Sequence, residues 1–180
     1  LIIAIAVKAY DRGPVFYFQD RLTLGGKPFK ICKFRSMCVD SEKNGARLAS
    51  KHDSRITPVG HVLRNLHLDE LPQLFNVFNG DMSLVGPRPE RESIMLEYEK
   101  ELPEFYYRLK VKAGLTGYAQ VYGKYNTTSY DKLKLDLTYI RNYSLLLDLK
   151  LILMTPKVLL MKESTDGFEE GLWEDPALKE

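Results

Sequence analysis

The sequence predicts an α+β fold, a mostly helical single domain that begins with a β-hairpin. Three observations support this prediction. Two runs rich in aromatic and β-branched residues flank Gly25-Gly26, the pattern of a hairpin. The rest of the chain shows helix start signals and apolar residues at helical spacing. The length of 180 residues and the 44% hydrophobic content suit one domain with a substantial core.

The chain opens with an apolar run, LIIAIAV, that ends at Lys8. Seven residues cannot cross a bilayer, which needs about 20 residues in a helix. The run also lacks the charged leader and cleavage site of a signal peptide. We therefore interpret residues 1–10 as the remnant of a membrane-inserted hydrophobic segment, truncated at the N-terminal membrane helix. The alternative is a buried strand or helical turn.

Residues 15–36 form the predicted hairpin, with the turn at Gly25-Gly26. Because strand side chains alternate, one face of the second strand carries Phe29, Ile31, Lys33 and Arg35. Residues 1–36 hold seven Lys and Arg against two Asp. This excess favours an anionic membrane surface or a phosphate-bearing ligand, and a solvated charged face is the alternative.

Two helices are predicted next. Thr57-Pro58 has the residues of an N-cap and first helical position, and this helix runs to about Leu66. Asp69 is the predicted N-cap of the following helix, which Gly80 ends. Its apolar positions at i, i+3, i+4 and i+7 are Leu71, Leu74, Phe75 and Phe78.

The remaining segments alternate between helix and loop. Residues 40–55 are polar and are expected to form a loop or an irregular helix. We expect an exposed, charge-rich helix at 90–102, a loop with a short strand at 110–126, and a helix at 129–142. A last helix is capped by Ser144 and is broken or kinked at Pro156. Because it is apolar nearly all round, it lies either deep in the core or at a membrane interface with its lysines extended toward water.

Several site classes are absent from the sequence. No Walker loop, dinucleotide fingerprint, zinc-ligand cluster or nucleophile elbow is present. Cys32 and Cys38 have no metal-like spacing, which favours a reduced, intracellular setting without a role for either. The three histidines stay unassigned.

Asp69 and Glu70 are adjacent carboxylates at a predicted helix start. Asp is a favoured N-cap and Glu in the first turn complements the helix dipole, so capping alone could explain both. A helix start also binds anions. A carboxylate there could attack phosphorus or hold Mg²⁺ beside a phosphate. Both interpretations stay open from these two residues.

Four cations complete a candidate site. Arg88 stands between two prolines in GPRPE, and a stiffly held guanidinium suits bidentate phosphate binding. Arg64 lies about one helical turn before Asp69, and Lys33 and Arg35 share a strand face. Each cation alone could be a surface charge. Together with the carboxylates they would form a Mg²⁺-assisted phosphoryl-transfer site.

With these motifs the chain resembles the bacterial sugar transferases, the monotopic phosphoglycosyl transferases. The resemblance covers nearly all residues before about 163, through GPVFYFQDR, GKPFKICKFRSM, TPVGHVLRNLHLDELPQLFNVFNGDMSLVGPRPE, VKAGLTGYAQVYGK and SLLLDLKLILMT. It implies transfer of a sugar 1-phosphate from a UDP-sugar to polyprenyl (undecaprenyl) phosphate, with release of UMP. This would be the first membrane step of exopolysaccharide, capsule or O-antigen synthesis.

The resemblance also implies residue roles. Asp69 would be the nucleophile, forming a covalent phosphoglycosyl-aspartate, and would lie near the required Mg²⁺. Glu70 would be its partner carboxylate and the base that assists attack by polyprenyl phosphate. Arg64 and Arg88 would hold phosphate or nucleotide. Lys124 stands where the family usually has arginine.

The chain departs from the family pattern at four positions, namely Ala113 for Pro, Tyr118 for Trp, Tyr122 for Asn and Lys124 for Arg. Lysine lacks the bidentate fork of arginine, which puts sugar or nucleotide contacts at Lys124 in question. The carboxylate pair and the PRP turn are intact, so we expect an active enzyme. The implied catalytic part is residues 11–162, followed by an acidic tail, 163–180.

The expected partners are a UDP-sugar, polyprenyl phosphate and membrane lipid, without nucleic acid, at the cytoplasmic face of the bacterial inner membrane. Two alternatives remain open. A soluble phosphohydrolase or nucleotide-sugar pyrophosphatase would use water as acceptor and would not need apolar ends. A non-catalytic membrane-binding scaffold would use Asp69 only as a helix cap.

Overall fold

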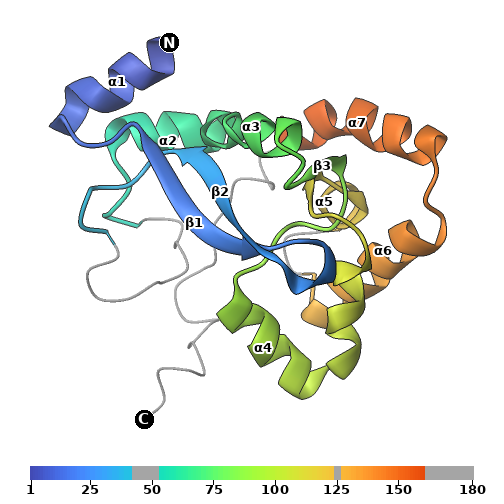
Figure 1. The fold of residues 1–180 in the computed structure, drawn as a ribbon. Helices are drawn as coiled ribbons and strands as arrows, with labels where there is room; N and C mark the ends of the chain where they lie inside the picture. Colours follow the sequence, from blue (N-terminus) through green and yellow to red (C-terminus); the bar gives the residue numbers. More distant parts are fainter. Residues whose placement is uncertain (42–52, 124–126, 161–180) are drawn as a thin grey trace.

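The computed structural model describes residues 1–41, 53–123 and 127–160 (Figure 1). It confirms a mixed helix-and-strand fold, with small sheets surrounded by helices. Most of the predicted 40–55 loop, Lys124 and the acidic tail lie outside the described residues.

The predicted hairpin is confirmed. Strands β1 (Phe16–Leu22) and β2 (Pro28–Phe34) pair antiparallel, joined by the short 3₁₀ turn η1 (Leu24–Gly26). Gly25 and Gly26 adopt positive φ angles of 69° and 76°, which glycine reaches without a steric penalty. The strand face predicted to carry Phe29, Ile31 and Lys33 is turned inward, since Phe29 and Ile31 are buried and the Lys33 side chain is only 18% exposed.

The helix predicted at Thr57 is confirmed as α2 (Pro58–Asn65). The Thr57 hydroxyl accepts a hydrogen bond from the Gly60 amide at 2.9 Å. A Cβ at Gly60 would lie 1.8 Å from the carbonyl oxygen of Ser36, so a larger residue would separate α2 from the chain that leaves β2. This close contact fixes α2 against the hairpin.

The helix start predicted at Asp69 is wrong. Asp69 lies inside a 3₁₀ turn, η2 (Leu68–Glu70), and its side chain caps nothing. The following helix, α3 (Gln73–Phe78), begins only after Pro72. Proline fixes φ and lacks an amide hydrogen, so it suits the entry to a helix and not the helix interior. The two carboxylates are therefore held in a tighter turn than a helix start would provide.

Helix α3 buries the opposite face to the one that apolar spacing suggests. Gln73 and Asn76 are buried, whereas Phe75 is 64% and Phe78 90% exposed. The Asn76 amide donates to the Lys30 carbonyl at 2.8 Å and accepts from the Cys32 amide at 2.9 Å. It thereby satisfies two backbone groups on the open edge of β2, a position that an apolar side chain could not fill.

A second, parallel pair joins β3 (Ser83–Val85) to β4 (Gly114–Thr116), and β4 is the short strand predicted within 110–126. The short helix α5 (Tyr118–Tyr122) that follows was not predicted. The strands approach closely through glycines, because a Cβ on Gly114 would lie 2.1 Å from the Gly86 nitrogen. This packing sets the start of the PRP turn, which leaves β3 at Gly86.

The main core lies among the hairpin end, α4 (Glu92–Glu101), the 3₁₀ helix η3 (Pro103–Lys110) and α6 (Ser129–Arg141). Its buried members are Leu22, Met95, Phe105, Leu109 and Leu133. The helices predicted at 90–102 and 129–142 are thus confirmed. The 3₁₀ helix between them was not predicted.

The last helix, α7 (Leu145–Leu159), is capped as predicted, with the Ser144 hydroxyl accepting from the Leu147 amide at 3.2 Å. A break or a kink was expected at Pro156; the helix continues through this residue, so the break is not present. Leu151 is fully buried, whereas Leu146 and Leu153 are 80% and 79% exposed. The helix lies on the surface and is not deep in the core.

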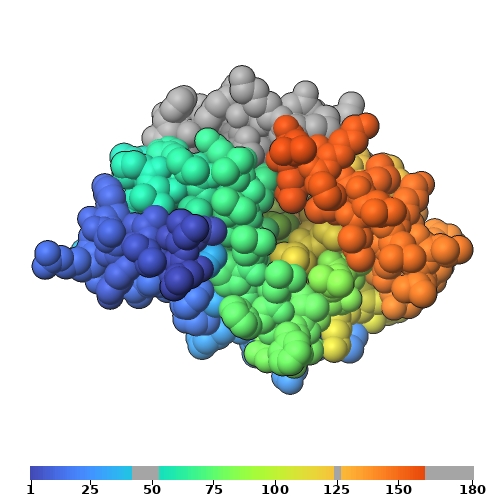
Figure 2. Space-filling view, turned by 90° about the horizontal axis from the view of Figure 1, so that it is seen from above, coloured from blue at the N-terminus to red at the C-terminus, as the bar shows by residue number. Residues whose placement is uncertain are grey.

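Four helices that carry exposed large apolar side chains lie on one side of the molecule. α1 (Ile2–Asp11), α2, α3 and α7 lie along the upper edge in Figure 1, and Figure 2 views this side from above. We define the apolar platform as the following exposed residues of these helices and of positions next to them: Leu1, Ile2, Ile5, Val62, Leu66, Leu71, Leu74, Phe75, Phe78, Leu145, Leu146, Leu149 and Leu153. No described helix is both long and apolar enough to span a membrane.

Candidate active site

The carboxylate pair is presented by a sharp change of direction after α2. His67 adopts the left-handed conformation, with φ 53°, and η2 follows at once. The turn η2 contacts both α2 and β2. Such a conformation is uncommon for a residue with a side chain and often marks a functional turn. Here it directs Asp69 and Glu70 back toward the hairpin.

Glu70 is held by two cations from separate elements. Lys33 of β2 donates to Glu70 Oε1 at 2.7 Å, and Arg88 donates to both carboxylate oxygens at 2.6 and 3.2 Å. Burial alone would raise the pKa of Glu70, but Arg88 and Lys33 outweigh burial and hold this pKa well below its usual value. Glu70 therefore stays ionised and accepts protons poorly, which favours an electrostatic role.

Asp69 differs from Glu70 both in its partners and in the direction of its pKa shift. It makes no hydrogen bond or ion pair with any described residue. Burial and then the charge of Glu70 raise the pKa of Asp69, while Lys33 and Arg64 act in the other direction. A partly buried carboxylate without a fixed partner has its oxygen lone pairs available for a ligand or for bond formation.

The structure brings together most of the predicted site. Lys33, Asp69, Glu70 and Arg88 form one group, which we call the open cluster. Arg64 lies near enough for its charge to lower the pKa of Asp69. Lys124 lies outside the described residues.

The structure places Arg35 elsewhere. Its guanidinium pairs with both carboxylate oxygens of Asp11 and donates to the carbonyl oxygen of Pro14. Only 7% of the side chain is exposed. Arg35 therefore ties α1 to the end of the hairpin, and it does not join the cations around Glu70. The expected substrate-binding role of Arg35 has no support in this geometry.

The PRP turn that carries Arg88 is anchored through its backbone carbonyls. Pro87 O accepts from the Gly114 amide at 2.9 Å, and Arg88 O accepts from Arg108 at 2.9 Å. Pro89 O accepts from Arg21 at 3.4 Å, and Glu90 O accepts from the Leu22 amide at 3.0 Å. Each of these four carbonyls has a partner, so the turn is fixed from outside.

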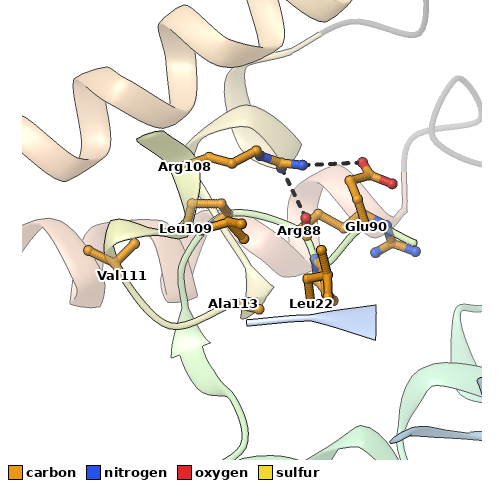
Figure 3. Close-up of a pocket in the computed structure, with 9 residues that line it drawn as sticks. Leu22, Arg88, Glu90, Arg108, Leu109, Val111 and Ala113 are labelled. Carbon is orange, nitrogen blue, oxygen red and sulfur yellow. Dashed lines mark hydrogen bonds and ion pairs between the residues drawn. The ribbon is translucent and has the colours of Figure 1, made fainter. Parts of the chain in front are cut away.

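Behind the turn lies a second charged group, the closed cluster of Glu90, Arg108, Lys132 and Asp136. Figure 3 shows Arg108 between the Glu90 carboxylate and the Arg88 carbonyl, above a small pocket lined by Leu22, Leu109 and Ala113. Arg108 and Asp136 pair at 2.8 Å with side chains 2% and 1% exposed. Lys132 pairs with Glu90. Sequence reasoning missed this cluster, because its members come from three separate segments of the chain.

Asp69 is the side chain best suited to a cation. Within the described residues no three His, Cys, Asp or Glu side chains gather into a metal cluster. Mg²⁺ commonly takes one or two protein carboxylates and completes its shell with water and substrate phosphate. The unpartnered oxygens of Asp69 fit that mode. Glu70, already committed to Lys33 and Arg88, fits it less well.

Fixed cations beside an unpartnered carboxylate are the kind of group that suits an anionic phosphate compound. The particular family follows from comparison. The model of the bacterial sugar transferase family matches residues 1–162, so this chain belongs to that family. The predicted family membership is confirmed.

Relatives with assigned activities agree with this family membership. The chain is 44% identical over 163 residues to the UDP-N-acetylgalactosamine-undecaprenyl-phosphate N-acetylgalactosaminephosphotransferase of Aeromonas hydrophila, covering 89% of this chain and 38% of the relative. It is 46% identical over 160 residues to the UDP-glucose:undecaprenyl-phosphate glucose-1-phosphate transferase of Klebsiella pneumoniae, covering 86% and 34%. The enzyme of the same name from Caulobacter vibrioides is 40% identical, with coverage of 91% and 63%. The chain thus spans about a third of the first two relatives.

Proposed function

We propose that this chain transfers a sugar 1-phosphate from a UDP-sugar to undecaprenyl phosphate, releasing UMP. The observation that carries the proposal is the contrast between the two adjacent carboxylates. Glu70 is fixed by Lys33 and Arg88, and Asp69 is left without a partner among the described residues. A helix cap would not need this arrangement, whereas a nucleophile beside fixed cations does.

In the first half of the proposed reaction, a carboxylate oxygen of Asp69 attacks the β-phosphorus of the UDP-sugar. The bond between this phosphorus and the bridging oxygen breaks, and UMP leaves with the bonding electrons. The product is a sugar phosphate linked to Asp69 as an acyl phosphate. Arg88 and Arg64 stabilise the negative charge that gathers on the phosphoryl oxygens.

In the second half, a phosphate oxygen of undecaprenyl phosphate attacks the same phosphorus. The bond to Asp69 breaks and the carboxylate is restored, leaving a polyprenyl diphosphate sugar. The acceptor phosphate is already largely ionised near neutral pH. Glu70 then serves mainly to hold Arg88 and Lys33 in place, because its lowered pKa makes it a weak base. Its expected role as a proton acceptor stays a prediction.

Mg²⁺ is the proposed cofactor. Asp69, together with the diphosphate of the donor, would hold the ion, which would neutralise charge on the phosphoryl oxygens. Since the chain supplies few ligands of its own, its affinity for the ion should depend on bound donor.

The proposed location is the cytoplasmic face of the bacterial inner membrane, with the apolar platform against lipid. The four platform helices lie on the same side of the molecule (Figure 2), and each carries exposed apolar side chains. An exposed patch of this extent is rare on monomers that have no partner surface. The unusual polarity of α3, with amides inside and phenylalanines outside, is explained if its outer surroundings are lipid.

The proposed function is tested by UMP release from UDP-sugars by the full chain, with and without undecaprenyl phosphate. We expect lipid-dependent release that Asp69→Asn lowers by about 10³-fold or more, as for loss of a nucleophile. Thermal unfolding of the variant should match the wild type. Lipid-independent release would indicate a hydrolase, and full activity in Asp69→Asn would refute the assigned nucleophile.

The proposed location is tested by vesicle flotation. Phe78→Ser removes a side chain that is 90% exposed and, by the proposal, buried in lipid. Burial of a phenylalanine contributes about 1.5–3 kcal/mol, so binding to vesicles should weaken by about 10-fold or more. The matched control is Phe18→Ser, which removes a 55% exposed ring from β1, away from the platform. Equal loss in both variants would contradict the assignment.

A further inference from the structure

Arg108 is a buried arginine whose hydrogen-bonding capacity is used within the protein. Its Nε and Nη2 reach Asp136 Oδ2 at 3.0 and 2.8 Å, and Nη2 also donates to Arg88 O at 2.9 Å. Nη1 lies 3.5 Å from Glu90 Oε1, and the guanidinium carbon is 4.8 Å from the ring centre of Phe105. With 2% of its side chain exposed, Arg108 is not placed to touch a substrate.

The residue that Arg108 holds is the one that faces the carboxylate pair. Arg88 lies between two prolines, neither of which has an amide hydrogen to donate. The turn therefore depends on what its carbonyls accept, and Arg108 holds the central one (Figure 3). Arg88 itself presents its guanidinium to Glu70 on the other side of the turn.

We propose that Arg108, oriented by Asp136, is a positioning residue for the reaction. It fixes the backbone of Arg88 and thereby the point at which the Arg88 guanidinium meets Glu70 and the donor diphosphate. This inference rests on the proposed function, in which Arg88 binds that diphosphate. In this proposal Arg108 does not contact the reacting atoms and acts only through Arg88.

The variant that tests this role is Arg108→Lys. Lysine keeps the charge but has one nitrogen, which cannot bridge Asp136, Glu90 and the Arg88 carbonyl as the planar guanidinium does. A shift of about 1 Å in a group that positions substrate can cost about 100-fold in rate. We expect kcat/KM for the UDP-sugar to fall by about 10- to 100-fold, with the KM for the donor raised.

A double-mutant cycle with Arg88→Lys separates positioning from simple loss of folded protein. If Arg108 acts through Arg88, adding Arg108→Lys to Arg88→Lys should change kcat/KM by less than about 3-fold, because coupled residues are not additive. A structural role alone predicts that the two losses multiply and that they follow the fraction unfolded. Multiplied losses would overturn the proposal.

Arg55→Lys is the matched control, since Arg55 also bridges a carboxylate and a carbonyl, those of Asp53 and Ser41, away from the PRP turn. It should keep wild-type kinetics. If Arg108→Lys does not fold, Asp136→Asn takes its place in the same cycle. If UMP release depends on lipid and Arg88→Lys weakens it, the proposed function is supported. Wild-type kinetics in Arg108→Lys would then refute the positioning role of Arg108 and leave the proposed function intact.

Discussion

The open and closed clusters lie on opposite sides of one turn and use their charges differently. In the closed cluster, Arg108 and Asp136 are almost fully buried and paired. In the open cluster, Glu70 takes both cations and Asp69 is left without a described partner. The comparison teaches that charge pairing alone does not mark a functional site. In the proposed function, the incompletely paired cluster carries the reaction and the completely paired cluster supports the turn between them.

The strongest test of this contrast is stability. Asp136→Ala would remove the closer carboxylate of the buried Arg108 and leave only Glu90, at 3.5 Å, so the free energy of unfolding should fall by about 3 kcal/mol. Asp69→Ala should leave it unchanged or slightly raised, because burial and Glu70 disfavour the ionised form of Asp69. Thermal or urea unfolding measures both. Similar losses in the two variants would remove the distinction between the clusters.

The loss of stability at acidic pH is the next largest expected effect. Burial raises the pKa of Glu90, but Lys132 and Arg108 outweigh burial and lower it from 4.5 to about 2. Since the folded state has the lower pKa, the stabilising contribution of Glu90 is complete above about pH 4.5 and disappears as the pH falls toward 2. It amounts to roughly 3 kcal/mol for a shift of this size.

The Glu90→Gln variant isolates this contribution. Urea unfolding between pH 2 and about 6 should show that wild type exceeds the variant at the upper end and converges with it at the lower end. Asp136, whose pKa burial raises, contributes a slope of the opposite sign, so the difference between the proteins is the quantity to compare. A difference that does not change with pH would show that Lys132 and Arg108 do not stabilise the Glu90 carboxylate.

Local signals predicted the elements well. The Gly25-Gly26 turn and the caps at Thr57 and Ser144 were found because each depends on residues only a few positions apart. The buried face of α3 was not predicted correctly. Apolar spacing reports a helical period, but it does not reveal that Asn76 satisfies two backbone groups of β2 and so turns the polar face inward.

The sequence identified most residues of the candidate site, but it predicted only some of the contacts between them. The carboxylate pair and Arg88 could be singled out from motifs, and the pairing of Lys33 with Glu70 joins residues 37 apart. Arg35 shares the strand face of Lys33, but its guanidinium pairs with Asp11 of α1. The spacing of residues along the sequence does not predict this contact. Arg108 was missed for the same reason, since its partner Asp136 is 28 residues away and neither lies in a recognisable motif.

Two lysines of β2 provide the finest test, because they differ mainly in the face they occupy. Lys33 points to Glu70 and its side chain is 18% exposed, while Lys30 pairs with Asp20 in solvent at 69% exposure. Lys33→Gln removes one of the two cations on Glu70, so kcat/KM for UMP release should fall by about 10-fold.

Lys30→Gln is the matched control on the same strand. An exposed ion pair contributes less than about 1 kcal/mol, so neither unfolding nor kcat/KM should change measurably. Both variants remove the same charge from the same strand, and therefore long-range electrostatics is held constant between them. If Lys30→Gln lowers turnover as much as Lys33→Gln, the general positive field of the hairpin attracts the anionic donor, and the direct contact of Lys33 with Glu70 is not what the reaction requires.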